Sequence, residues 1–279
     1  MTTESIEQYH ANPAISHSKL ECFRRRPALF FKKYIAKTLP ASEDTNAFRL
    51  GSAVHCAILE ESTFADRYAV KPDCDRRTKE GKAVFADWSA LNLGKTFISA
   101  EELVQVIAMR EAVAAHPIAC DLLKTGTPEM TWRVPQANAL GALQCRTDWF
   151  NADGCAASEG EPYVLDIKTV ETLDRDAFRT FERAAFSYGY HRQAGFYLPL
   201  LNEFAGRPVR KMFHVAVEKC EPYGVAVYRL SDDAIAKGQD ETIGDLIQLK
   251  KSLETNTWPN IDPAIHELGL PKWYGRDST

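Results

Sequence analysis

The sequence lacks the features of a membrane, secreted or disulfide-bonded protein. No apolar run approaches the roughly 18 residues that a membrane-spanning helix needs. The segment from Met1 to Ser5 has neither the charged nor the apolar region of a signal peptide. The seven cysteines are scattered without C-x-x-C spacing, which favours reduced thiols over disulfides or a zinc site. We therefore expect a cytoplasmic protein with no membrane partner.

The sequence also lacks an excess of basic residues. Its 34 lysines and arginines against 38 aspartates and glutamates give a net charge of −4, so a general affinity for nucleic acid is not expected of the whole surface. Internal repeats and low-complexity linkers are absent as well. A chain of 279 residues with 45% hydrophobic content can bury a sizeable core. We expect a single domain over residues 1–279, with any DNA contact confined to local patches.

The hydrophobic pattern predicts an α/β protein whose first half is helical and whose second half holds a sheet. We expect a mostly helical part at 1–125, a sheet-containing core at 126–256 and a tail at 257–279. Helices are expected at 19–36, 44–60, 78–93, 99–115, 174–203 and 231–255. Strands are expected at 129–135, 141–150, 162–170, 210–218 and 223–229. A hairpin, a long helix and a returning strand favour a mixed central sheet flanked by helices.

Capping signals and large aromatic residues support some of these helices. Ser18, with Glu21 three residues later, is expected to cap the first helix, and Ser99 opens a second capping box. Phe85 and Trp88 are expected to be the buried anchors of the helix at 78–93. These signals place the helix starts more firmly than the hydrophobic pattern alone.

Two acids in the predicted sheet carry the chemical hypothesis. Asp148 ends one β-rich run, and Asp166 lies in the next, with Lys168 two residues further along the same strand and therefore on the same face. A hairpin would bring the two carboxylates together. Paired acids that hold a hard divalent cation beside an ammonium group are typical of metal-assisted phosphodiester hydrolysis. An Asp-x-Lys pattern alone is common and needs further support.

Three residues outside these strands provide that support. His55 lies within an otherwise apolar helix, where a histidine is more often an ordinary core residue. Gln193 and Tyr197 are four residues apart and share a helix face, although ordinary helix packing also explains them. The ordered set of all these residues is harder to obtain by chance than any one of them. Glu129 and Glu60 are weaker candidates, Glu129 as an outer residue beside the site.

This ordered series resembles the PD-(D/E)xK nuclease superfamily in its RecB-like branch. The likeness narrows to the C-terminal nuclease of RecE (exonuclease VIII) and covers residues 14 to 275. The supporting segments are ISHSKL at 15–20, LGSAVH at 50–55, DRRTKEGK at 75–82, YGYHRQAGFY at 188–197 and VAVEKCEPY at 215–223. One departure is that full-length RecE carries a large additional N-terminal region.

The resemblance implies a restriction-endonuclease-like core and a metal-dependent mechanism. It implies that His55, Asp148, Asp166 and the backbone carbonyl of Ile167 bind one or two Mg²⁺ or Mn²⁺ ions. Lys168 is expected to act electrostatically rather than as a general base, with Gln193 and Tyr197 positioning DNA or water. Some relatives hold an iron–sulfur cluster with cysteines after the nuclease core. We expect none here, because no cysteine follows Cys220.

The resemblance also implies a substrate and partners. These are linear double-stranded DNA digested 5′-to-3′, a RecT-like single-strand annealing protein that receives the 3′ overhang, and a homo-oligomeric ring, with a tetramer favoured and a trimer possible. A RecB-like endonuclease in repair or defence, or a catalytically inactive DNA-binding protein, remains open. The candidate DNA contacts, any of which could instead be a solvated helix face, are Arg24, Arg25, Arg76, Arg77, Lys79, Lys82 and Arg192.

Overall fold

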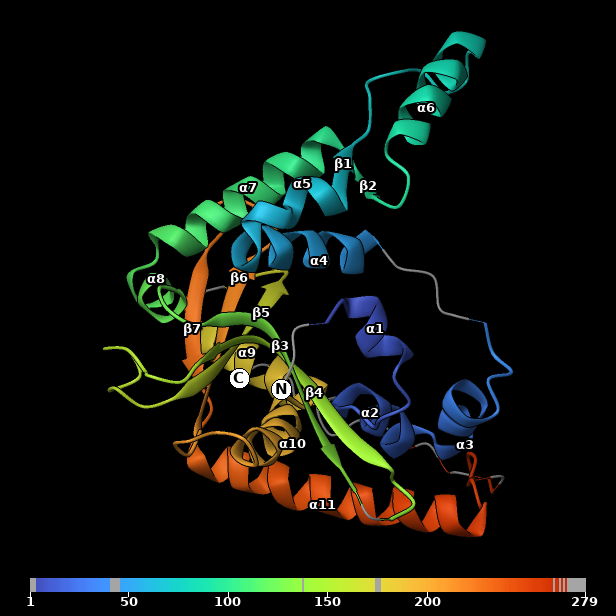
Figure 1. The fold of residues 1–279 in the computed structure, drawn as a ribbon, viewed down its shortest axis with the longest axis vertical. Helices are drawn as coiled ribbons and strands as arrows, with labels where there is room; N and C mark the ends of the chain where they lie inside the picture. Colours follow the sequence, from blue (N-terminus) through green and yellow to red (C-terminus); the bar gives the residue numbers. More distant parts are fainter. Residues whose placement is uncertain are drawn as a thin grey trace.

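A five-stranded mixed sheet forms the centre of the molecule (Figure 1). The computed structural model describes residues 4–40, 46–136, 138–173 and 177–262, and residues 264, 265, 267 and 269 beyond them. The strands follow the order β3 (Thr127–Pro135), β4 (Ala142–Asn151), β5 (Tyr163–Val170), β6 (Lys211–Glu218) and β7 (Val225–Arg229). β5 and β6 run parallel, and the other neighbours run antiparallel. The expected mixed α/β core is confirmed, with strand ends close to those predicted.

Helices cover both faces of the sheet. On one face, α4 (Asn46–Leu59), α7 (Ala100–Ala115) and α8 (Pro117–Leu123) share an apolar core with β5 and β6. On the other face, α2 (His17–Arg25), α10 (Tyr190–Asn202) and α11 (Asp232–Thr255) build a second apolar core. Alternation along β5 explains this division, because Leu165 and Ile167 enter the first core and Val164 enters the second. Asp166 and Lys168 therefore point toward the α10 face.

Two helices that the sequence predicts as continuous are broken. The expected helix at 19–36 begins after Ser16 instead of Ser18 and stops at Arg25, before α3 (Pro27–Phe30) and a π-helical turn (Phe31–Ile35). Arg26 has extended φ of −155°, as the residue before a proline favours. The expected helix at 174–203 is divided into α9 (Ala177–Tyr188) and α10 by Gly189, whose φ is +76°.

A projecting arm rises from the α4–α7 side of the molecule (Figure 1). Its base is a parallel pair that the sequence analysis did not predict, β1 (Tyr68–Val70) with β2 (Thr96–Ile98), and its tip is α6 (Lys79–Leu91). Phe85 and Trp88 are half-buried and pack on Phe97 of β2 instead of the main core. They were expected to be buried anchors, and that expectation is wrong because α6 stands away from the body.

The remaining elements agree with the capping signals. Ser99 and Glu102 form the expected capping box of α7, and Ser231 caps α11. Trp258 packs on Phe30 near the end of the described chain, whereas residues 273 and 274 lie outside it. The short elements are α1 (Ile6–Ala11), a 3-10 turn (Glu61–Thr63) and α5 (Phe64–Arg67).

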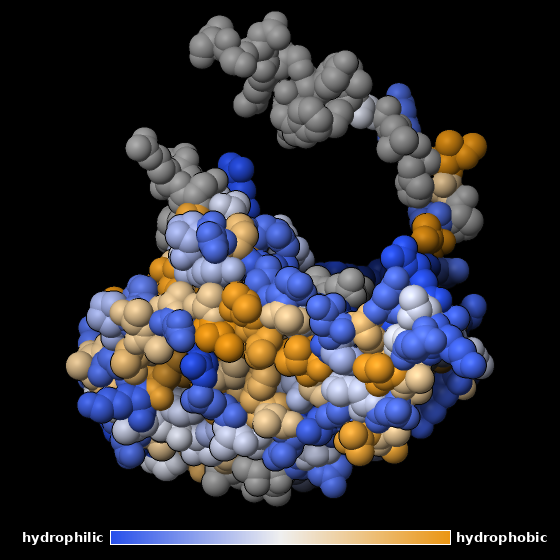
Figure 2. Space-filling view, turned by 90° about the horizontal axis from the view of Figure 1, so that it is seen from above, coloured by the Kyte–Doolittle hydropathy of each residue, from blue (hydrophilic) through white to orange (hydrophobic). Residues whose placement is uncertain are grey.

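The arm side of the molecule also exposes apolar side chains. Figure 2 views it from above, and hydrophobic residues gather there between hydrophilic ones. Val104 and Ile107 of α7 are among the exposed apolar residues, at 64% and 39% exposure. Within the described residues no single helix is long and apolar enough to cross a membrane, although the bent pair α7 and α8 meets that test together.

Candidate active site

The predicted acids meet where β4 and β5 separate. The two strands pair only from Trp149–Leu165 to Asn151–Tyr163, and beyond that point β4 leaves β5. The backbone N–H of Ile167 consequently donates to Oδ2 of Asp148 at 2.8 Å instead of to a neighbouring strand. The N–H and C=O of one strand residue point to the same edge, so the Ile167 carbonyl also faces this opening. The predicted role of this carbonyl as a metal ligand stays a prediction.

Asp166 lies at the centre of a second group of contacts. The Lys168 ammonium is 2.5 Å from Oδ2 of Asp166, and the side-chain amide of Gln193 donates to Oδ1 at 2.7 Å. Gln193 reaches the acid from α10, across the face that β5 presents to this helix. The aromatic ring of Tyr190 covers the Lys168 ammonium at 4.6 Å. Three of the residues predicted for catalysis are therefore in direct contact.

The charges at the site are unequal. Burial, followed by the negative charges of Asp166 and Glu129, raises the pKa of Asp148 well above its ordinary value. Burial is the largest single influence on the Asp166 pKa and disfavours the charge, but the interactions with Lys168 and His214 together outweigh it and hold the Asp166 pKa well below the ordinary value. Burial opposes the Lys168 charge too, and the neighbouring carboxylates raise its pKa nonetheless. Lys168 is thus a stable cation, which favours an electrostatic role over that of a general base.

One group of side chains has the composition and spacing of a metal site. His55, Glu129 and Asp148 each offer a ligand atom, and these atoms lie within 4.8 Å of one another. Nδ1 of His55 is 3.3 Å from Oδ2 of Asp148, and burial lowers the His55 pKa, so the imidazole is neutral and able to coordinate. The pKa of Asp148 is elevated by burial and by the neighbouring carboxylates, and a bound cation would offset both. Two carboxylates and one imidazole fit a Mg²⁺ or Mn²⁺ ion.

Glu129 is closer to this group than the sequence analysis expected. It stands opposite Asp148 on β3, between the register pairs Pro128–Trp149 and Met130–Thr147. Its φ of +54° is uncommon for a residue with a side chain and is the kind of local strain found at functional sites. No sequence pattern announces a positive φ at a glutamate. The outer role predicted for Glu129 therefore differs from its place in the structure, among the possible ligands.

Tyr197 lies next to the acids without contacting them. Burial is the main cause that raises its pKa, with smaller contributions from the charges of Asp166 and Asp148. The ring meets His17 edge-on and packs in the α10-side core. Among the described residues, no hydrogen bond joins its hydroxyl to either acid. Its predicted role in positioning DNA or water stays a prediction.

Comparisons with known proteins agree with this geometry. A family model described as a PDDEXK-like domain of unknown function (DUF3799) matches residues 16–262. The chain belongs to this family. No curated protein matches. A solved structure from Eubacterium rectale, described as a "Putative exonuclease", has 11% sequence identity and a TM-score of 0.63, over 97% of this chain and 96% of that one. A second, SSO0001, has 15% identity over 71% of this chain and 84% of that one, with a TM-score of 0.28, too low to support an argument.

One predicted DNA contact of this PDDEXK-like domain is engaged in ion pairs within the protein. The Arg192 side chain is only 11% exposed, and its guanidinium pairs with Glu21 at 2.5 Å and with Glu241 at 3.3 Å. Arg192 thus joins α10 to α2 and α11. The sequence could not distinguish a solvent-facing arginine from a buried one, because both fit the same helix position.

The other predicted DNA contacts have different surroundings. Arg24 pairs with Asp245 at 3.0 Å, and Arg25 is 61% exposed, 3.8 Å from Glu21. On the arm, the Arg76 guanidinium stacks on Phe85, and Arg77 pairs with Asp75 while remaining 92% exposed. Lys79 and Lys82 are exposed on α6. The arm therefore offers the most accessible of the predicted basic residues.

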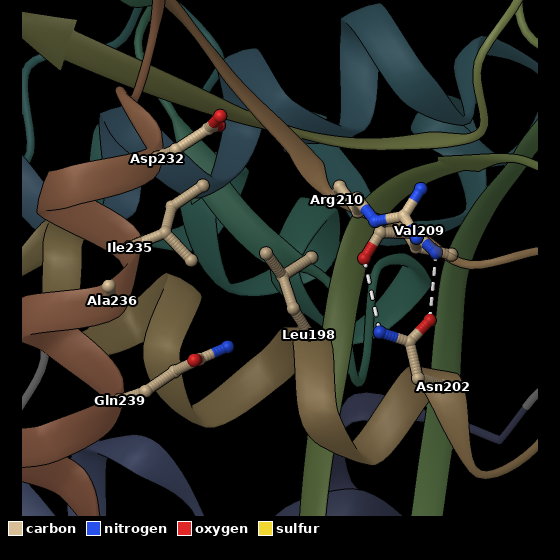
Figure 3. A pocket seen from close by; sticks show the side chains of 8 residues that line it. All are labelled: Leu198, Asn202, Val209, Arg210, Asp232, Ile235, Ala236 and Gln239. Atoms are coloured by element: carbon tan, nitrogen blue, oxygen red, sulfur yellow. Dashed lines mark hydrogen bonds between the residues drawn. The ribbon is translucent and has the colours of Figure 1, made fainter.

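The structure has one surface pocket beside the site and another away from it. The first, of about 480 Å³, is lined by Glu129, by its ion-pair partner Arg146, and by the paired Glu60 and Arg67. The second, of about 300 Å³, lies between α10 and α11 (Figure 3). There the amide of Asn202 is fixed by two hydrogen bonds to the backbone of Val209. None of the predicted catalytic residues lines the second pocket.

Proposed function

We propose that this protein is a divalent-metal-dependent deoxyribonuclease. The observation that carries the proposal is the convergence of Asp148, Asp166, Lys168 and His55 where β4 and β5 separate, within a PDDEXK-like domain. Two acids and a neutral imidazole suit a divalent metal ion, and a stable ammonium suits the charge that develops in metal-assisted phosphodiester hydrolysis. The fold alone would not support this proposal, because one fold hosts many functions.

Each residue has a role that its surroundings permit. Asp148, Asp166, His55 and the Ile167 carbonyl would hold the ion, with Glu129 as a further candidate ligand. A bound divalent cation supplies Lewis-acid chemistry, neutralising charge on the scissile phosphate and acidifying water. The Lys168 ammonium stabilises the extra negative charge of the pentavalent state. Gln193 fixes one oxygen of Asp166 and so restricts the direction of the other.

We further propose that the enzyme is an exonuclease that digests linear duplex DNA 5′-to-3′. The support is the resemblance to RecE-type nucleases and the fold shared with a protein described as a putative exonuclease. The product would be a 3′ single-stranded overhang for a RecT-like annealing protein, and the ion would be Mg²⁺ or Mn²⁺. A closed ring, with four subunits favoured over three, would keep a chain of net charge −4 on its DNA.

The test uses purified protein with matched linear and closed-circular duplex DNA. Each end of the linear DNA is labelled in turn, and reactions contain Mg²⁺, Mn²⁺ or EDTA. We expect metal-dependent loss of label from the 5′ ends while the circle stays intact. Nicking of the circle would overturn the exonuclease proposal in favour of an endonuclease of repair or defence. Binding without cleavage in every metal would overturn the deoxyribonuclease proposal itself.

A further inference from the structure

A buried histidine lies beside Asp166 with no hydrogen-bond partner. His214 of β6 is the register partner of Asp166 in the parallel β5–β6 ladder, so the two side chains share a face of the sheet. His214 is 1% exposed, and neither of its ring nitrogens makes a hydrogen bond. Most buried polar atoms are paired, and a buried ring with two unpaired nitrogens is costly. No sequence motif marks His214.

The position of the ring relative to Asp166 is specific. Nδ1 of His214 is 3.9 Å from Oδ2 of Asp166, too long for a hydrogen bond but within reach after a small side-chain movement. The ring centroids of Tyr190 and Phe181 lie 5.0 Å and 6.2 Å from that of His214, and this packing fixes the plane of the imidazole. The ring therefore faces the carboxylate oxygen that Lys168 occupies.

The two oxygens of Asp166 have different partners. Oδ1 accepts a hydrogen bond from Gln193, whereas Oδ2 has an ion-pair contact with the Lys168 ammonium at 2.5 Å and no hydrogen-bond partner among the described residues. Lys168 cannot move toward a substrate phosphate without lengthening that contact, and the buried oxygen would then lose its nearest cation. A buried carboxylate without a compensating partner carries its full desolvation penalty. Nδ1 of His214 faces this oxygen at 3.9 Å and could donate to it.

We propose that His214 is a positioning residue whose Nδ1–H takes over Oδ2 of Asp166 when the Lys168 ammonium moves to the substrate phosphate. The inference rests on the proposed nuclease function, in which Lys168 acts on the phosphate. His214 itself touches neither substrate nor metal. It keeps Asp166 charged and in place while its lysine partner is engaged elsewhere, so it affects turnover more than DNA binding.

Three substitutions of His214 distinguish the effect of a hydrogen-bond donor at the Nδ1 position from the effect of side-chain volume. His214→Leu removes both ring nitrogens, His214→Asn keeps an N–H near the Nδ1 position, and His214→Gln keeps one near the Nε2 position. We expect Leu and Gln to lower kcat by about tenfold or more with KM for DNA unchanged, and Asn to restore most of the activity. His191→Leu, at another buried histidine, controls for removal of a buried ring and is expected to keep its turnover per folded molecule.

A second measurement needs no cleavage. Imidazole nitrogen NMR of the protein without metal reports which ring nitrogen carries the proton, and His214→Asn identifies the signal. Lys168→Met frees Oδ2 of Asp166, so we expect the His214 signal to move to an Nδ1-protonated, hydrogen-bonded form. An unchanged His214 signal in Lys168→Met would overturn the proposal that His214 replaces Lys168 at Asp166. The same conclusion would follow if His214→Asn were as inactive as His214→Leu. A wild-type protein that cleaves no DNA would instead refute the nuclease proposal, leaving the NMR result to decide on His214.

Discussion

Gly195 on α10 and Gly238 on α11 lie where the two helix backbones touch. A Cβ on Gly195 would lie 2.2 Å from the carbonyl carbon of Gly238, and a Cβ on Gly238 would lie 1.9 Å from the carbonyl oxygen of His191. No side chain fits there, because the obstructing atoms are backbone. The contact fixes α10 on its support, and Gln193, two residues before Gly195, reaches Asp166 from that position.

We predict that Gly195→Ala destabilises the protein by about 3 kcal/mol, at the upper end of typical overpacking costs. The variant should also lose the hydrogen bond from Gln193 to Asp166, because a displaced α10 moves Gln193 away from the acid. Urea unfolding of the two proteins measures the difference. Gly244→Ala, on α11 like Gly238 but with open space around it, is the control and should be stabilising by about 0.5–1 kcal/mol. Equal stability of the two variants would contradict the packing argument.

The metal group predicts a second set of effects. Wild-type protein should gain thermal stability from Mn²⁺ or Mg²⁺, because an ion that binds only the folded state shifts the unfolding equilibrium. Asp148→Asn and Glu129→Gln should each lose most of that gain, since each removes a charged candidate ligand. The measurement is the change in Tm on adding metal, with Glu203→Gln at an exposed position as control. A full metal-dependent shift in Glu129→Gln would return that residue to an outer role.

Lys168 should behave differently from the acids. Its pKa is raised by the carboxylates around it, so it is charged at any working pH and acts as a cation. Lys168→Ala should therefore abolish cleavage, while the protein remains folded and keeps its metal-dependent rise in Tm. Residual activity above a few per cent of wild type would show that the ammonium is not required. Loss of the metal response would show instead that Lys168 supports the ligands.

The sheet and the acid pair were predictable because their signals are local. Strand alternation, a hairpin and the two-residue spacing of Asp166 and Lys168 are properties of short segments. The projecting arm was not predictable, because half-buried Phe85 and Trp88 follow the same apolar period as buried residues. The helix breaks at Arg26 and Gly189 do have local signals, namely the proline after Arg26 and the glycine itself. The hydrophobic pattern continues across both positions, and it therefore predicts unbroken helices.

Long-range contacts account for the remaining misses in the site. Glu129 becomes a possible ligand through β3 register and a positive φ, and His214 through parallel pairing with a strand 48 positions away in sequence. Neither relation leaves a pattern within one segment. Arg192 was assigned to DNA for the same reason, because its partners Glu21 and Glu241 come from distant helices.

The ion pair of Arg192 with Glu21 predicts how stability depends on pH. Burial disfavours the Glu21 charge, but hydrogen bonds from Arg192 hold the Glu21 pKa below its ordinary value of 4.5. A carboxyl group with a lowered folded pKa stabilises the fold above its unfolded pKa, and that stability is lost as the pH falls through the folded value. Arg192→Met should therefore cost about 3 kcal/mol at pH 7, because it removes the nearest cation from a carboxylate whose side chain is only 13% exposed and leaves the longer contact to Arg25 at 3.8 Å.

The cost of Arg192→Met should shrink as the pH falls below 4.5, where Glu21 is protonated in the unfolded chain. Urea unfolding at pH 7 and near pH 4 tests the sign. Arg207→Met is the control and should show little change with pH, because Arg207 is exposed and its hydrogen bonds within the described part of the chain go to backbone carbonyls. A constant cost for Arg192→Met across this range would mean that packing of its stem, and not its charge, stabilises the helices.

The arm predicts where DNA affinity resides. Lys79 and Lys82 are exposed on α6 and make no ion pair among the described residues, so both ammonium groups are available to phosphates. Removing one lysine–phosphate interaction should reduce the slope of log affinity against log salt by about 0.9 for duplex DNA.

Binding is measured without metal in the Lys168→Ala protein, which leaves the DNA uncut. Replacing both arm lysines by alanine should lower the slope by about 1.8, whereas Lys251→Ala on α11 should leave it unchanged. If the Lys168→Ala protein, its double arm variant and its Lys251→Ala variant gave equal slopes, the DNA would bind to another surface. The slope counts only the counterions that DNA-bound lysines release, so a change in net charge alone does not alter it.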